Sequence, residues 1–305
     1  MGLAPEVRRV APRPLFAAFM PRGPIDPKDA ASRAESPIAP PFPDILIASG
    51  RRAIPYVRAV RRASGGRTFT IVLKDPRTGT GTADLIWVQQ HDRLRGSNVV
   101  ATLLAPHRVS PARLAEARAN PDPRIAALSS PRVAVLVGGN SRHHRFTPND
   151  IARLANDLRR LVEHGTSLAV TTSRRTPTAL VEALRLIAAP PRHFLWDGSG
   201  PKDENPYIAL LAQADAIVAT ADSTNMIGEA AATGVPVLVF EPSGGHPKIT
   251  RYLDGLVSYG AVRRFAGRLE DYAYQPLDNT PEIAAEARAA YARHLAAVQS
   301  GRPER

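Results

Sequence analysis

Short apolar runs alternate with amphipathic helical segments through the second half of the sequence, and this alternation constrains the fold most strongly. The clearest apolar run, residues 132–137, leads directly into Gly138-Gly139-Asn140. Thr147 and Pro148 then have the residue types of a helix N-cap and a first helical position. Strands joined by helical crossovers form parallel sheets. Further strands are predicted at 167–171, 215–219 and 235–240, and further helices from Thr176 and over 223–232.

The first half has the same pattern after a proline-rich start. Seven prolines from Pro21 to Pro43 exclude a continuous helix or a central strand, so residues 1–43 are expected to form an irregular, exposed segment. The whole chain is therefore predicted to be α/β, with two Rossmann-like, doubly wound parallel-sheet domains. Strands are predicted at 44–48, 68–73, 84–88 and 98–104, and a helix over 54–63. The expected divisions are the segment 1–43, a first domain 44–125, a second domain 126–275 and a C-terminal segment 276–305 with a helix from Thr280.

Length and composition set limits on the class of protein. The chain has 305 residues, enough for two domains, and no cysteine, which excludes disulfides, thiolate metal sites and a cysteine nucleophile. It has no bilayer-spanning apolar run and no stretch of signal-peptide type, so a cytoplasmic location is expected. The net charge of +12 favours polyanionic partners. Because no RNA-binding motif is present, nucleic acid is not expected, and peripheral contact with an anionic inner-membrane face is the secondary expectation.

Polar residues follow the predicted strands of the second half, at the sheet edge where parallel sheets bind ligands. Gly, Ser, Thr and Arg supply amide, hydroxyl and guanidinium donors that suit phosphate oxygens, although loops that bind nothing are also polar. No G-x-G-x-x-G motif and no P-loop lysine follows any strand. Glu229, within the predicted helix 223–232, is either a solvated glutamate or an acceptor for ribose hydroxyls. The candidate residues are Gly138, Gly139, Asn140, Arg174, Arg175, Asp222, Ser223, Thr224, Asn225 and Glu229.

The strand ends of the first half offer acid–base chemistry. His91 and Asp92 form the strongest pair, because histidine titrates near neutrality and a neighbouring carboxylate can tune it, although a surface His-Asp pair is an equal alternative. Gly50, Arg51 and Asp75 follow the two preceding strands. The adjacent histidines 143 and 144 do not predict a metal site, because neighbouring histidines seldom point at one ion and no carboxylate cluster accompanies them.

Four sequence blocks resemble the mitochondrial fission ("elongated mitochondria") family, whose bacterial members are regarded as glycosyltransferases. The most specific is TADSTNMIGEAAATGVP at 220–236. The others are VGGNSRHH at 137–144, ASGRR at 48–52 and HDRLRGSN at 91–98, and the resemblance covers about residues 44–248. The part from Glu229 to Pro236 is also similar to the donor site of the bacterial lipid-linked peptidoglycan glycosyltransferase, in which the equivalent Glu binds the donor ribose.

The resemblance implies a GT-B fold, in which two Rossmann-like domains face a cleft. The second domain would hold a nucleotide-sugar as substrate, and the first would hold an envelope-type lipid or saccharide acceptor, with Gly50, Arg51 and Asp75 on the acceptor side. The last helix would cross back to the first domain. No metal or other cofactor would be needed, because a helix dipole and arginines can stabilise the leaving diphosphate. By matching position, Gly139, Asn140, Arg174, Ser223, Thr224 and Glu229 would bind the donor, and His91 or Asp92 would be the general base.

The sequence departs from the family pattern at its start. Family members begin with a strand and a Gly-rich segment, and this chain starts beyond them, so the first domain is expected to lack its initial strand. Either the true start lies upstream or the chain is an impaired remnant. Two other functions stay open: a non-catalytic interaction protein, as in the plant branch of the family, and a sugar-nucleotide epimerase on the same fold. The epimerase is less favoured, because it would need several cleft carboxylates.

Overall fold

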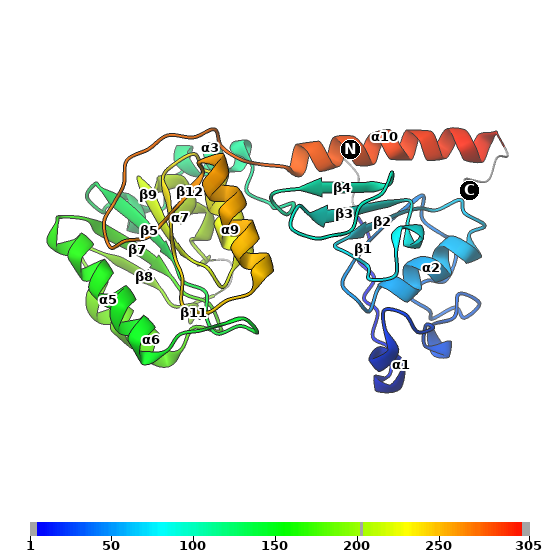
Figure 1. The fold of residues 1–305 in the computed structure, drawn as a ribbon, viewed down its shortest axis with the longest axis horizontal. Helices are drawn as coiled ribbons and strands as arrows, with labels where there is room; N and C mark the ends of the chain where they lie inside the picture. Colours follow the sequence, from blue (N-terminus) through cyan, green and yellow to red (C-terminus); the bar gives the residue numbers. More distant parts are fainter. Residues whose placement is uncertain (1–4, 202–203, 301–305) are drawn as a thin grey trace. The chain divides into compact units, whose positions relative to one another are not determined.

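A computed structural model describes residues 5–201 and 204–300, which divide into two compact units. The first unit contains the chain up to Thr102 together with the C-terminal residues from Thr280, and the second contains Leu103–Asn279. Each unit has a parallel sheet with helices on both faces (Figure 1). The predicted α/β class with two Rossmann-like domains is therefore confirmed.

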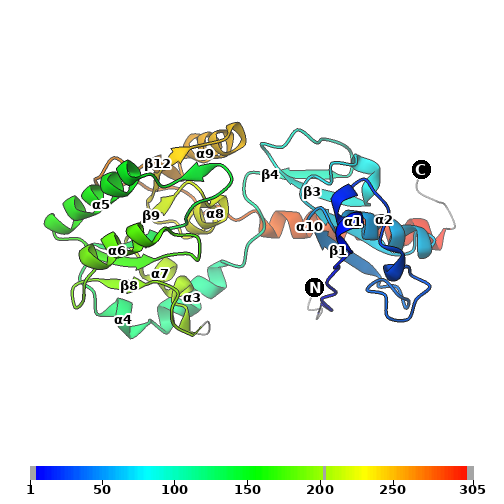
Figure 2. The ribbon, with the colours of Figure 1, turned by 90° about the horizontal axis from the view of Figure 1, so that it is seen from below.

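The sheet of the first unit has four parallel strands in chain order. On one face, α2 (Ile54–Ala63) packs Ile54 and Val57 against the sheet. On the other face, α10 (Thr280–Gln299) packs Ala290 against Phe69. Figure 2 shows α1 and α2 in front of this sheet and α10 behind it. The strands are β1 (Ile45–Ser49), β2 (Phe69–Leu73), β3 (Leu85–Gln89) and β4 (Val99–Thr102), with the 3-10 turn η2 (Thr80–Thr82) between β2 and β3.

The proline-rich N-terminal segment is packed, which corrects the expectation of an exposed linker. It forms a short helix, α1 (Pro14–Phe19), and a 3-10 turn, η1 (Pro27–Asp29). Met20 and other apolar residues of the segment pack on the outer side of α2, and the hydroxyl of Tyr56 donates a 2.5 Å hydrogen bond to the buried carboxylate of Asp29. Prolines exclude regular structure along the segment, but they do not prevent its apolar side chains from being buried.

The second unit has a six-stranded parallel sheet in the order β12-β10-β9-β5-β7-β8. The first strand of the unit in chain order, β5, is central, and the chain winds outward from it first to β7 and β8 and then to β9, β10 and β12. This is a doubly wound order, because the direction in which the chain adds strands reverses between β5 and β9. The bounds are β5 (Arg132–Leu136), β7 (Ser167–Thr171), β8 (Phe194–Trp196), β9 (Ala216–Thr220), β10 (Val237–Phe240) and β12 (Val262–Arg264).

Period-two alternation in β5 divides the core of this unit into two layers. Val133 and Val135 face α5 and α6, whereas Ala134 and Leu136 face α3, α7, α8 and α9. The helices are α3 (Pro111–Ala119), α4 (Pro123–Ala126), α5 (Pro148–Glu163), α6 (Thr178–Ile187), α7 (Tyr207–Gln213), α8 (Thr224–Ala231) and α9 (Pro247–Tyr259). Two short strands, β6 (His144–Arg145) and β11 (Ser243–Gly244), pair antiparallel outside the main sheet.

Residues 103–125 belong to the second unit, which differs from the boundary predicted from the sequence, where they are the end of the first domain. The helix α3 packs against α7, and Leu114 of α3 is part of the second unit's core. In the part of the chain that the structure describes, no helix combines the length and the apolar character needed to cross a bilayer.

Candidate functional site

The loops that follow β5, β7 and β9 meet at the carboxyl edge of the second sheet, where the winding direction reverses. In doubly wound folds this is the place where ligands bind. The carboxylate of Asp222, in the loop after β9, lies at the centre of the three loops, and its side chain is fully buried. The site is therefore organised around one buried charge.

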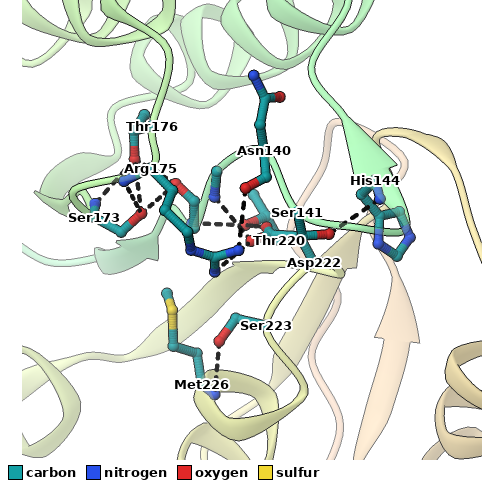
Figure 3. Close-up of polar contacts among 12 residues, drawn as sticks. Asn140, Ser141, His144, Ser173, Arg175, Thr176, Thr220, Asp222, Ser223 and Met226 are labelled. Atoms are coloured by element: carbon teal, nitrogen blue, oxygen red, sulfur yellow. Dashed lines mark hydrogen bonds and ion pairs between the residues drawn. The ribbon is translucent and has the colours of Figure 1, made fainter. Parts of the chain in front are cut away.

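Three groups neutralise or hydrogen-bond this charge (Figure 3). The amide of Gly139 donates to Oδ2 of Asp222 at 2.8 Å, and the hydroxyl of Thr220 donates to Oδ1 at 2.7 Å. The guanidinium of Arg175 lies 3.3 Å from Oδ2 and remains half-exposed. Thr220 also accepts a 2.8 Å hydrogen bond from the amide of Gly138. Asp222 thus fixes the positions of the backbone amides after β5 and of the Arg175 side chain.

The two glycines after β5 are required by this close packing. A Cβ atom on Gly138 would overlap the Asp222 carboxylate, and one on Gly139 would overlap the backbone of Arg175. From the sequence alone, this pair could form either a tight turn or a site of close ligand approach. In the structure the close approach is to the protein's own loops.

The loop after β7 is tied to the loop after β5 by reciprocal bonds. The amide of Asn140 donates to the carbonyl of Arg175 at 3.0 Å, and the Arg175 guanidinium donates to the carbonyl of Asn140 at 3.1 Å. The hydroxyls of Ser173 and Thr176 both donate to the carbonyl of Gly138. Thr176 was expected to begin α6, but the helix begins at Thr178, with Pro177 at its N-cap position.

A pocket of about 210 Å³ adjoins the N-terminal end of α8. The Ser223 hydroxyl caps the helix by accepting from the amide of Met226 at 3.5 Å, as expected for a serine at this position. First-turn amides have no partner within their own helix and can bind anions. The lining residues are Ala105, Pro106, His107, Arg108, Thr224, Asn225, Gly228 and Glu229.

Glu229 is held in the pocket wall by a partly buried tyrosine. The hydroxyl of Tyr207, the first residue of α7, donates a 2.6 Å hydrogen bond to Oε2 of Glu229. Burial, together with the Glu229 carboxylate, raises the pKa of Tyr207, so this tyrosine stays a hydrogen-bond donor at neutral pH. Tyr252 supports the same helix by donating to the carbonyl of Thr224 at 2.9 Å. Glu229 is therefore a positioned carboxylate and not a freely solvated helix residue.

The two adjacent histidines lie in different surroundings. The ring of His143 contacts that of His246, with ring centroids 4.4 Å apart, whereas His144 is buried. Burial lowers the pKa of His144, although the nearby Asp222 charge acts in the opposite direction. Their separation is explained by the β6–β11 pairing, which turns consecutive side chains to opposite sides.

The candidate residues of the first half lie in the first unit. Gly50 and Arg51 follow β1, Asp75 follows β2, and His91 and Asp92 follow β3, so all five come at the carboxyl ends of parallel strands. Gly50 has a φ of 91°, a conformation that favours glycine. Asp75 accepts from the amide of Arg77 at 2.8 Å within its turn. Their assignment to the acceptor and to proton transfer stays a prediction.

Several residues of the site were missed by the sequence analysis. Ser173, Thr176 and Thr220 form the inner support of the strand-end loops, and Tyr207 orients Glu229. The loop 105–108 lines the pocket although it lies more than one hundred residues from α8 in the chain. Its only local signal is the polar pair His107-Arg108, which comes soon after a predicted strand and so resembles the other strand ends.

Among the predicted donor residues, Arg174 is exposed. The side chain of Asn140 accepts a hydrogen bond from the amide of Phe146 at 2.9 Å.

The chain is similar in sequence to proteins of one family. The model of the family described as "Mitochondrial fission ELM1" matches residues 1–291. The mitochondrial fission protein ELM1 of Arabidopsis thaliana is 29% identical over 273 residues, covering 81% of this chain and 63% of that protein. The uncharacterized protein RP120 of Rickettsia prowazekii (strain Madrid E) is 33% identical over 158 residues, covering 50% of this chain and 44% of that protein. The chain thus spans less than two thirds of the length of these relatives.

The fold is similar to those of solved sugar-nucleotide enzymes. The UDP-GlcNAc 2-epimerase of Methanocaldococcus jannaschii matches with a TM-score of 0.50 and 12% identity, over 83% of this chain and 77% of that one. The ADP-heptose LPS heptosyltransferase II of E. coli matches with a TM-score of 0.42 and 15% identity, over 82% of this chain and 77% of that one. At these identities the likeness concerns the fold alone.

Proposed function

The chain belongs to the mitochondrial fission ELM1 family, and from that premise we propose that it binds a nucleotide-sugar in its second unit and transfers the sugar to an envelope-type lipid or saccharide. The observation that carries the proposal is the pocket at the N-terminal end of α8, where Glu229 is fixed by Tyr207. The pocket adjoins the reversal point of a doubly wound sheet. The named substrate of the similar epimerase, UDP-GlcNAc, supports a nucleotide-sugar as the ligand class.

In this proposal the donor diphosphate lies against the first turn of α8, with Thr224 and Asn225, and arginines stabilise its charge. The helix dipole and guanidinium groups then stabilise the leaving group without a metal ion. The Glu229 carboxylate accepts hydrogen bonds from the ribose hydroxyls, and the Tyr207 hydroxyl keeps it in position. Asp222 acts indirectly, by holding Arg175 and the Gly139 amide.

The transfer step joins the acceptor oxygen to the anomeric carbon of the sugar. The bond from that carbon to the diphosphate oxygen breaks, and the diphosphate leaves with the electron pair. The acceptor hydroxyl loses its proton to a general base, for which His91 or Asp92 of the first unit is proposed. The loops that contain Gly50, Arg51 and Asp75 would contact the acceptor.

A calorimetric screen of the full chain against UDP, GDP, CMP and their sugars tests the donor site. We expect one nucleotide to bind, and Glu229→Gln to weaken it roughly tenfold or more, because a hydrogen bond to a charged group is worth about 1.5–3 kcal/mol. Glu163→Gln, a substitution of an exposed glutamate on α5, is the matched control and should bind normally. Folded protein that binds none of these ligands would contradict the proposal.

Two other functions are distinguished by further measurements. The name of the Arabidopsis relative favours a non-catalytic interaction protein. In that case the variants His91→Ala and Glu229→Gln would keep the biological function of the wild-type protein. A stably bound partner protein would also be isolated together with the chain in pull-down experiments. A sugar-nucleotide epimerase on the same fold would convert one nucleotide-sugar into its epimer without any acceptor, and analysis of the products of that incubation would identify it.

A further inference from the structure

The outer face of α1 is apolar and exposed. Leu15 and Phe19 are 66% and 63% exposed, and their spacing of four residues places them together on one side of the helix. On the opposite side, Phe16, Ala17 and Met20 face the apolar contact with α2. A helix that is apolar on both its buried and its exposed side is unusual on a protein surface and marks an interaction site.

Arginines lie beside α1 and the residues that follow it. The guanidinium of Arg51 donates to the carbonyl of Ala17 within α1 at 3.3 Å, and that of Arg58 donates to the carbonyls of Pro21 at 2.9 Å and Gly23 at 3.1 Å, just beyond the helix. Arg22 and Arg52 are exposed. These contacts fix positive charge against the C-terminal end of α1, where the helix dipole favours it.

The acidic residues nearby do not offset this charge at the surface. Residues 5–62 contain 11 lysines and arginines but only 5 aspartates and glutamates. Two of these acids are buried: Asp26 pairs with Arg13 at 2.7 Å, and Asp29 accepts from Tyr56. The exposed face of α1 is therefore an apolar patch within a positive surface.

We infer that α1 docks the protein onto an anionic lipid bilayer, with Leu15 and Phe19 entering the boundary between headgroups and acyl chains. Arg22, Arg51 and Arg52 would contact lipid phosphates, as cationic side chains beside apolar ones do at membrane interfaces. A bilayer fits better than an acidic protein, because a stable protein interface needs about 800 Å² on each side and α1 presents only two large side chains. Figures 1 and 2 show α1 at the outside of the first unit, beyond α2. The inference does not depend on the proposed nucleotide-sugar chemistry.

Vesicle sedimentation with the full chain tests the apolar contribution. We expect binding to phosphatidylcholine vesicles only when phosphatidylglycerol is included, and release at high salt. Leu15→Ser combined with Phe19→Ser should lower the partition coefficient roughly tenfold or more, because both side chains lose their burial in lipid. Leu186→Ser removes a leucine of α6 that is 81% exposed and should leave the partition coefficient unchanged.

Charge variants test whether vesicle binding depends on where the arginines lie or only on the net charge of the protein. Arg22→Glu with Arg52→Glu should weaken binding, whereas Arg268→Glu with Arg288→Glu changes the net charge equally and should have a much smaller effect. Equal losses in both pairs, no effect of the Leu15 and Phe19 substitutions, or no binding of folded wild-type protein would each overturn the inference. Nucleotide binding, measured by calorimetry on the same variants, should be unchanged, which separates this result from a failure of the proposed function.

Discussion

Gly138 and Asp222 show that residues at the carboxyl ends of neighbouring strands can pack against one another, whether or not a ligand is bound. The buried carboxylate accepts from the Gly139 amide and from Thr220, and it lies beside the half-exposed Arg175. Every group that the carboxylate holds belongs to a different strand-end loop or to the strand beneath it. The Asp222 side chain therefore holds together the loops that follow β5, β7 and β9.

We predict that Gly138→Ala lowers the free energy of unfolding by about 2 kcal/mol, because the added methyl group would overlap the Asp222 carboxylate. Urea denaturation measures the effect. Gly81→Ala is the control, since no atom lies within 4 Å of the added group, and its unfolding free energy should be unchanged or raised by up to about 1 kcal/mol. Equal losses in the two variants would mean that the contact with Asp222 is not tight.

At this scale the sequence indicated which strand ends carry chemistry but not what each residue contacts. Asp222 and Ser223 were selected because they follow an apolar strand and precede a helix, and Glu229 because it lies farther along that helix, where a carboxylate could accept from ribose hydroxyls. That Asp222 is committed to Gly139 and Arg175, or that Glu229 accepts a hydrogen bond from Tyr207, depends on contacts 22 to 83 residues apart in the chain. Such contacts have no local pattern, so Tyr207 was beyond sequence reasoning, and the loop 105–108 offered only its polar His107-Arg108 pair as a signal.

Among the elements, α5 has the best-defined beginning. The Thr147 hydroxyl accepts from the amide of Asp150, and Asp150 accepts from the amide of Thr147, which forms a capping box. Asp150 also accepts from the amide of Ser243 at 3.1 Å and so connects α5 to β11. Burial acts to raise the pKa of Asp150, but hydrogen bonds from Thr147 and Ser243 outweigh it and hold the pKa well below its ordinary range.

We predict that Thr147→Ala lowers the free energy of unfolding by about 1 kcal/mol, as expected for loss of a cap. Asp150→Ala should lower it by about 2–3 kcal/mol, because the amide of Ser243 also loses its acceptor. Chemical denaturation of both variants provides the comparison, and Ser110→Ala, at the simpler cap of α3, should resemble Thr147→Ala. If Asp150→Ala is no worse than Thr147→Ala, the connection to β11 contributes nothing.

Most elements with a clear period and a clear end signal were predictable, and the shortest strands were not. The helix 54–63 and the strand 167–171 have the predicted bounds, because each has a clear period and a clear end signal. The strands β8 and β12 have only three residues each, too few to show a period. The helix α9 was missed although Pro247 at its first turn and apolar residues at 249, 252, 253 and 256 give a helical signal. The preceding run of Gly and Pro concealed its start.

The stability of the whole molecule should depend on pH through His144, which is buried, and His193, which is partly buried. Burial lowers the pKa of His144, and burial with the Arg192 charge lowers that of His193, below the ordinary value of about 6.5. Below that pH the unfolded chain takes up protons that the folded chain does not, so the free energy of unfolding falls as the pH falls from about 6.5. Urea midpoints measured from pH 7 to pH 5 should decrease, and His144→Asn should reduce the slope. An unchanged slope in that variant would exclude His144 as a source.

The first unit should also depend on a helix from the far end of the chain. Tyr291 and His294 of α10 contact Phe69, with ring centroids 5.5 and 5.3 Å apart, and His294 bonds the carbonyl of Arg67 at 3.0 Å. We predict that Tyr291→Ala destabilises the first unit by about 2 kcal/mol. Hydrogen exchange should then accelerate in β1 to β4 but not in the second unit. Tyr259→Ala, on the exposed side of α9, should have no such effect, and uniform acceleration across both units would contradict the prediction.

The return of α10 to the first sheet sets an order for folding on the ribosome. Residues 103–279 are translated between β4 and α10, which takes about 10 to 35 s at roughly 5–20 residues per second. During that interval the nascent first unit has Phe69, Ile71 and Leu85 without the helix that covers them. The second unit, whose strands and helices are contiguous, can complete its core sooner. Chaperone binding during synthesis should therefore concentrate on the part of the protein that emerges first.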